Sequence, residues 1–130
     1  MHATPMIWTG RALSALFVLF MLGASIAPKL LGAAIATETM VALGWPDAPT
    51  LLIGLIELGC VLLYLLPQTS VLGAVLMTAV LGGAIATQMQ AGSPLLSHTL
   101  FGIYIGLFMW GGLWLRSPAL RAVFPLKRGA

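Results

Sequence analysis

Four long apolar stretches, at about 8–27, 48–66, 71–90 and 95–115, constrain this chain more than any other feature. A helix needs about 20 mostly apolar residues to cross roughly 30 Å of hydrocarbon, because each residue adds about 1.5 Å. Each of the four stretches comes close to that length. We therefore predict an all-α fold, a membrane four-helix bundle in which the 130 residues form a single domain.

The composition agrees with a membrane environment. Hydrophobic residues make up 60% of the chain and charged residues 7%, against roughly 45–50% and about 25% in soluble domains. So few charges could hardly cover a small water-soluble protein, whereas lipid makes every charge costly. The net charge of +3 comes from a few basic residues concentrated at the chain ends. We expect the lipid bilayer as a partner and no nucleic acid.

The connection over 28–49 is the one long link between apolar stretches, and it is not a polar loop. Thr37 resembles an N-cap for a short helix over 38–43, and Gly44 is suited to end that helix. Trp45 follows, and tryptophan favours the headgroup region. We predict a short amphipathic helix at the membrane interface between the first and second spans.

Basic residues predict the orientation of the bundle, because cytoplasmic segments carry an excess of Lys and Arg. One lies at the front of the first apolar stretch and four follow the last, namely Arg11, Arg116, Arg121, Lys127 and Arg128. On the opposite side, Lys29 is the only Lys or Arg in the sequence. Four spans place both ends of the chain on one side, so we predict that both termini are cytoplasmic.

Small residues recur at helical spacing in the third and fourth stretches. Within lipid, helices associate through close packing of such residues. We expect these faces to be helix–helix contacts, and they could also serve a homodimer. The residues are Ala74, Thr78, Gly82 and Ala86 in the third stretch, and Gly102, Gly106, Gly111 and Gly112 in the fourth.

Glu57 is the most informative polar residue, because it lies near the centre of the second stretch. A carboxylate at that depth costs several kcal/mol unless it is protonated, paired or facing water. It marks either a functional site or a structural hydrogen bond between helices. Helical spacing places it on one face with Thr50, Gly54, Cys60, Val61 and Tyr64.

Two cations of the first stretch are candidates to face Glu57. Arg11 and Lys29 are 18 residues apart, which is about five helical turns, so they share a face if the helix continues through Pro28. Ser14 and Ser25 flank this polar edge. Each cation lies about 13 Å along the axis from the level of Glu57. Direct pairing and snorkelling to the nearest interface both remain open.

Further ligand-binding candidates lie on the other stretches. Tyr64 shares the face of Glu57, Gln88 can both donate and accept hydrogen bonds, and His98 begins the fourth stretch. With Glu57, Lys29 and Arg11 they complete the predicted site. We expect no metal site, because the chain has two histidines, one of them His2, and one cysteine. We assign no catalytic residue.

Several motifs in order resemble those of the DoxX-like membrane proteins, over about residues 8–125. They are PKL at 28–30, MVALGWP at 40–46, IGLIEL at 53–58, YLLPQT at 64–69, LGGAIAT at 81–87 and WGGLWLR at 110–116. The resemblance implies a four-helix bundle in the bacterial inner membrane, with Lys29 and Glu57 as recurrent polar positions. Relatives place a histidine where this chain has Gln88. They include a subunit of a thiosulfate:quinone oxidoreductase and partners of oxidative-stress enzymes.

Three functions compete on these observations. The first is a membrane subunit or partner of a redox system, which binds a quinone or another lipophilic molecule near Glu57 and has no intrinsic cofactor. The second is a small proton-linked carrier. The third is a structural or assembly protein whose polar core fixes the helix register. In none of them do we expect the chain to be an enzyme on its own.

Overall fold

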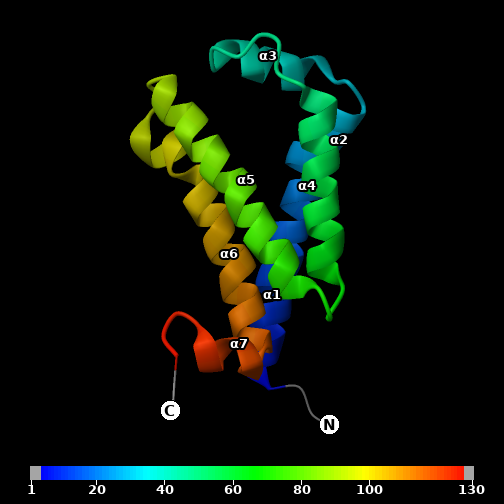
Figure 1. Ribbon diagram of the computed structural model, residues 1–130, viewed down its shortest axis with the longest axis vertical. Coiled ribbons are helices and arrows are strands. Elements are labelled where there is room, and N and C mark those ends of the chain that lie inside the picture. The colour runs from blue at the N-terminus through cyan, green and yellow to red at the C-terminus, as the bar shows by residue number, and fades with distance from the viewer. Residues whose placement is uncertain (1–3, 128–130) are drawn as a thin grey trace.

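The computed structural model describes residues 4–127, so His2 and Arg128 lie outside the described residues. The regular elements of that part are all helices (Figure 1). In chain order they are α1 (Pro5–Phe20), the π-helical turn η1 (Met21–Ile26), α2 (Ala27–Leu30), α3 (Ala34–Ala42), α4 (Thr50–Leu65), α5 (Ser70–Gln90), the π-helical turn η2 (Leu95–Thr99), α6 (Phe101–Arg116) and α7 (Pro118–Val123).

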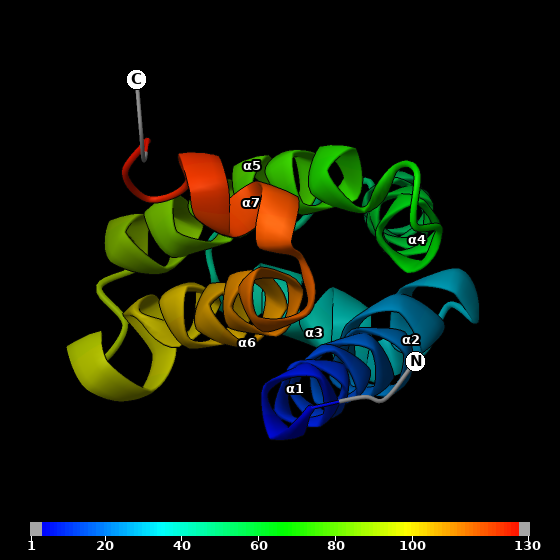
Figure 2. The ribbon, with the colours of Figure 1, turned by 90° about the horizontal axis from the view of Figure 1, so that it is seen from below.

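Four helical rods form the bundle, which confirms the predicted fold class (Figures 1 and 2). Among the described residues, three rods are long and apolar enough to cross a membrane: Pro5–Leu30, Ser70–Gln90 and Leu95–Arg116. The fourth, α4, is apolar but has 16 residues, a length of roughly 24 Å. It ends one residue before the predicted 66, because Leu66 precedes a proline and is extended.

The first rod continues past Pro28, three residues beyond its predicted end at 27. Proline has no backbone N–H to donate, and its ring normally clashes with the preceding helical turn. Here the wider turn η1 comes immediately before, and the N–H of Ala27 bonds back to the carbonyl of Leu22. The π-helical turn therefore lets the helix pass the proline.

The rods pack tightly in one half of the bundle. Its largest buried side chains include Phe17, Val61, Met77 and Met109. Glycines bring the backbones together there. A Cβ on Gly73 of α5 would lie 2.7 Å from the carbonyl oxygen of Cys60 on α4, and one on Gly112 of α6 would lie 2.7 Å from the backbone nitrogen of Ser14 on α1. Close packing through small residues is how helices associate within lipid.

In the other half, α5 and α6 diverge from α2 and α4 (Figure 1). Ala74 of the predicted small-residue stripe is buried, and Thr78 accepts a hydrogen bond of 2.8 Å from Trp110. Gly82 and Ala86 are exposed, and no described atom lies within 4 Å of a Cβ built on Gly82. The prediction of a continuous helix–helix face is therefore wrong for the second half of α5.

The glycines of α6 fulfil the prediction. A Cβ on Gly102 would lie 3.0 Å from Ile85 of α5, and one on Gly106 would lie 3.8 Å from Leu81. Gly111 and Gly112 face α1 instead. One helix therefore uses its first glycine pair against α5 and its second against α1.

The outer faces of the bundle carry large apolar side chains. Leu19, Leu62 and Leu107 each expose more than half of their surface, and many others expose more than a third. Soluble proteins rarely show apolar surface on this scale, and lipid removes the cost of exposing it. The protein is a multi-pass membrane protein whose outer faces contact the bilayer.

Helix α3 lies across the end of the bundle where α5 and α6 diverge from α2 and α4 (Figure 1). It begins at Ala34, so Thr37 lies inside the helix rather than at its N-cap. Gly44, with a φ of +84°, follows its end as predicted. Apolar and polar residues are distributed around α3 without a distinct apolar face, so the expectation of an amphipathic helix is wrong.

The beginning of α1 and helix α7 lie together at the opposite end (Figures 1 and 2). Arg116 ends α6 and Arg121 lies in α7, where it donates hydrogen bonds to the carbonyls of Trp114 and Leu115. The predicted basic cluster, as far as the structure describes it, is therefore on one end of the bundle.

Candidate functional site

The site is built around an ion pair between the first rod and α4. The Nζ atom of Lys29 lies 3.0 Å from Oε1 of Glu57. Ser25 donates to the same carboxylate, with its Oγ 3.0 Å from Oε1 and 3.1 Å from Oε2. Lys29 also donates to Ser25, at 2.7 Å to Oγ and 3.3 Å to the carbonyl oxygen. The three side chains thus form one hydrogen-bonded group.

Local structure explains how they meet. Ser25 in η1 and Lys29 in α2 are four residues apart, so they project from the same side of the rod. Gly54 lies one turn before Glu57 on α4, and a Cβ there would be 2.8 Å from the Cβ of Lys29. The missing side chain lets α2 and α4 approach closely enough for the ammonium and carboxylate to touch.

The ion pair is largely buried inside the bundle. The side chain of Lys29 is 13% exposed and that of Glu57 is 7% exposed. Charges in such a setting are costly alone and need a partner with good geometry and additional hydrogen bonds. Ser25 supplies those bonds, and the opposite charges of Lys29 and Glu57 offset each other within the bundle.

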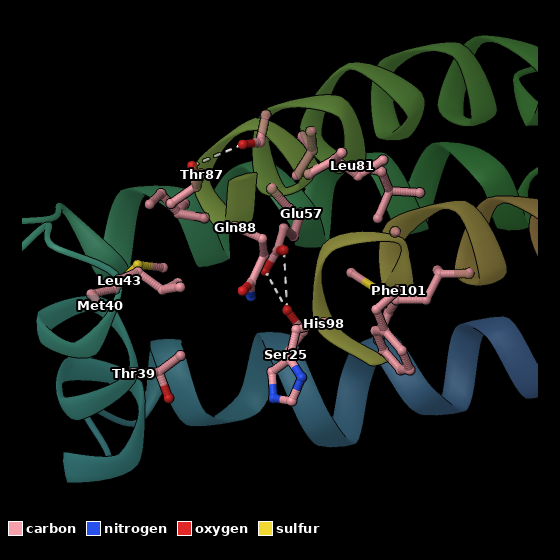
Figure 3. A pocket seen from close by; sticks show the side chains of 18 of the residues that line it. Ser25, Thr39, Met40, Leu43, Glu57, Leu81, Thr87, Gln88, His98 and Phe101 are labelled. Carbon is pink, nitrogen blue, oxygen red and sulfur yellow. Dashed lines mark hydrogen bonds between the residues drawn. The ribbon is translucent and has the colours of Figure 1, made fainter. Parts of the chain in front are cut away.

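One wall of a cavity of about 480 Å³ is formed by this group (Figure 3). The cavity lies at the open end of the bundle, where α5 and α6 diverge from α2 and α4 (Figure 1). All four rods and α3 contribute to its lining. Most of the lining is apolar, for example Phe20, Met40 and Leu81. Its polar side chains are Ser25, Lys29, Thr39, Glu57, Thr87, Gln88, His98 and Thr99. Apolar walls with a few convergent polar groups are typical of small-molecule sites.

Gln88 and His98 line the same cavity as Glu57, on α5 and η2 (Figure 3). The Oε1 atom of Gln88 is buried and has no hydrogen-bond partner among the described residues. His98 is exposed, and its Nδ1 lies 2.7 Å from the Oγ of Ser97. Within residues 4–127, no three His, Cys, Asp or Glu side chains gather in a way that could hold a metal ion.

Tyr64 belongs to a different network, in the tightly packed half of the bundle. Its hydroxyl donates to the carbonyl of Met109 at 2.6 Å and lies 2.9 Å from the Oγ of Ser14. Arg116 donates to that same Oγ at 3.2 Å. Because the tyrosine proton goes to Met109, Ser14 donates to Tyr64. This chain of bonds connects α1, α4 and α6 away from the Glu57 cavity.

Arg11 does not meet Glu57. It is exposed, and its guanidinium lies 4.8 Å from the ring centroid of Trp8. The prediction of a shared face with Lys29 assumed 3.6 residues per turn, but η1 has wider turns and rotates the residues that follow it. The predicted axial gap is also wrong for Lys29, because the rod reaches Leu30 and brings Lys29 level with Gly54.

Three features of the site escape sequence reasoning. Ser25 is recognisable as part of the polar edge of the first rod, but its role as a shared hydrogen-bond partner depends on η1. Gly54 is on the predicted face of α4, where a lone glycine gives no sign of which helix it contacts. The part of the lining that α3 and Trp45 provide depends on how the long connection folds back.

Replacing Gly54 with alanine should disturb the ion pair by displacing Lys29. The added Cβ would collide with Lys29 and also lie 3.2 Å from a methyl group of Leu30. We expect a loss of about 1–3 kcal/mol in the free energy of unfolding, as for other overpacked contacts. Equilibrium unfolding of the purified protein in detergent measures it. Gly59→Ala on the same helix, where no described atom lies within 4 Å of the new Cβ, should cause no loss, and equal losses would contradict the role of Gly54.

The sequence model of the DoxX-like family matches residues 12–112, which include Ser25, Lys29, Glu57, Gln88 and His98. No curated protein and no solved structure matches the chain.

Proposed function

Because the chain belongs to the DoxX-like family, we propose that it is a membrane subunit or partner of a redox system and binds a quinone or another lipophilic small molecule. The binding site is the cavity beside Glu57. The observation that supports this most is the Ser25–Lys29–Glu57 group on the wall of an otherwise mostly apolar cavity of about 480 Å³. That size is within the range of small-molecule pockets.

The chemistry of the cavity suits a molecule with an apolar body and a polar head. Phe20, Met40 and Ile105 offer apolar surface for a ring or chain. Glu57 and Gln88 line the same cavity and offer hydrogen-bonding groups. A quinone ring carries oxygens that can exchange protons in its redox chemistry, and a carboxylate is a common proton acceptor and donor. The redox partner and any cofactor come from outside this chain.

Binding of a decyl-tailed benzoquinone, in its oxidised and reduced forms, tests the proposal. A ligand at about a hundredfold its Kd stabilises a protein by about 2.7 kcal/mol, so the unfolding temperature of the purified protein should rise by several degrees. Glu57→Gln should reduce the rise, because the amide keeps the size of the side chain but loses its charge. Glu38→Gln on the exposed side of α3 is the matched control. No rise with either form of the quinone would contradict the proposal.

A structural or assembly role is the alternative that one observation favours. The Ser25–Lys29–Glu57 group joins the first rod to α4 where the remaining helices diverge, so it could act as a register lock alone. In that case Glu57→Gln lowers stability, and no lipophilic ligand raises the unfolding temperature of any variant. The thermal-shift experiment therefore separates the two roles.

We also propose that the protein lies in a bacterial inner membrane with both termini in the cytoplasm. Arg11, Arg116 and Arg121 lie toward the end of the bundle where α1 begins, which supports this orientation. A reporter active only in the cytoplasm, fused to the C-terminus, tests it. The open face of α5 around Gly82 supports a homodimer, and crosslinking in the membrane tests that.

A further inference from the structure

A second hollow adjoins the Glu57 cavity. It is an apolar groove of about 320 Å³ between α1 and α6, lined by Leu16, Phe17, Phe20, Phe101, Tyr104, Ile105 and Phe108. Phe20, Phe101 and Ile105 also line the Glu57 cavity. The ring centroids of Phe20 and Phe101 are 5.4 Å apart. The two hollows therefore share a wall of a few side chains.

The groove faces the lipid. Leu16 is 54% exposed and Phe108 42%, while Phe20 and Phe101 are 39% and 40% exposed. Its lining is nearly all apolar, in contrast to the cavity with its polar group. Phe20 and Phe101 are thus in contact with the cavity on one side and with the bilayer on the other. A molecule that enters from the membrane would leave an apolar tail in this groove.

The hydrogen bonds within the Ser25–Lys29–Glu57 group decide which polar headgroup of a ligand fits the cavity. Lys29 has three N–H groups, and the structure gives each one an acceptor, namely the two oxygens of Ser25 and Glu57 Oε1. Ser25 has one proton, which goes to the carboxylate. These two residues have no donor left for a ligand. The carboxylate of Glu57, in contrast, can accept about four bonds, and its contacts come from two donor groups, the Ser25 hydroxyl and the Lys29 ammonium.

Gln88 adds to this imbalance. Its buried Oε1 has no partner among the described residues and lies on the same cavity. The free capacity of Glu57 is therefore for acceptance, whereas the amide of Gln88 can both accept and donate. An ether or a ketone could accept a hydrogen bond from the Gln88 amide but would bring no donor to Glu57, while a hydroxyl group could also donate to Glu57.

On the basis of the proposed function, we propose that the ligand is a hydroxyl-bearing lipophile, such as a long-chain phenol or the hydroquinone form of a quinone. Its hydroxyl donates to Glu57 in the cavity, and its apolar tail reaches the groove between α1 and α6 when the contacting rings of Phe20 and Phe101 move apart. The chain thus prefers the reduced, hydroxyl form of a quinone over the oxidised, carbonyl form.

A pair of probes without redox chemistry tests the head. Para-nonylphenol and its methyl ether have the same tail and ring, but only the phenol has a donor. We expect the phenol to bind the purified protein at least about tenfold more tightly, which corresponds to one hydrogen bond, with tryptophan fluorescence as the readout. The double variant Lys29→Met/Glu57→Leu, which leaves no unpaired charge and removes the acceptor at residue 57, should lose most of this preference. Equal binding of both probes by the wild type would overturn this inference and leave the proposed function standing.

A tryptophan in the groove tests the tail. Leu16→Trp should fill the groove and weaken the binding of para-nonylphenol about tenfold, while para-cresol, which has almost no tail, should bind as before. Leu19→Trp on the same helix is the control, because Leu19 is 67% exposed and lines neither hollow. An unchanged affinity in Leu16→Trp would exclude the groove as the tail site. If no phenol, ether or quinone binds, the proposed function fails together with this inference.

Discussion

Glu57→Leu alone should lower the free energy of unfolding by about 3 kcal/mol, the lower end of what breaking a buried pair costs. The reason is that Lys29 keeps its charge, is 13% exposed and loses its anionic partner. The loss stays at the lower end because Lys29 is close to the end of the rod, at Leu30, where a lysine can turn its ammonium group outward. Equilibrium unfolding in detergent measures it.

The double variant Lys29→Met/Glu57→Leu should recover the stability to within about 1 kcal/mol of the wild type, because apolar residues replace buried pairs without large loss. Its ligand binding should not recover. Glu38→Leu, at an exposed position of α3, controls for the loss of an acidic residue as such. Full stability in Glu57→Leu would show that the ion pair does not contribute to the free energy of unfolding. An unstable double variant would show that the position of Ser25 or the packing around the cavity requires the two charges.

Gly112→Ala should strongly destabilise the bundle. Its Cβ would contact the Oγ of Ser14 and lie 2.7 Å from the backbone nitrogen of Ser14 and 2.9 Å from the carbonyl oxygen of Gly10. Two of these neighbours are backbone atoms, so α1 and α6 must separate. We expect a net loss of about 2 kcal/mol in the free energy of unfolding, even though alanine favours the helix by about 1 kcal/mol over glycine.

Gly111→Ala is the matched control on the neighbouring residue. Its Cβ would lie 3.7 Å from a methyl group of Leu13, which is ordinary contact, so its stability should stay the same or rise slightly. Separation of α1 and α6 should also break the bonds from Arg116 to Ser14 and from Ser14 to Tyr64. If the two variants unfold alike, the close contact between α1 and α6 is not what holds this half of the bundle.

The sequence alone determined the bundle and the buried face of α4. Apolar stretches of this length have few alternatives to crossing lipid as helices, because a backbone in hydrocarbon must satisfy its own hydrogen bonds. Spacing in α4 then placed Gly54, Glu57, Cys60, Val61 and Tyr64 on one face, and all five are buried. Both predictions rest on local periodicity, which does not depend on how the helices later pack.

Tertiary structure decided which cation meets Glu57. A regular helix would put Arg11 and Lys29 on the same face, but the turn η1 rotates the later residues and brings Lys29 and Ser25 to the carboxylate. Only the packed bundle shows that α5 and α6 diverge and that α3 covers the opening. These features follow from backbone hydrogen-bond register and from contacts between distant segments, and neither leaves a periodic pattern in the residues.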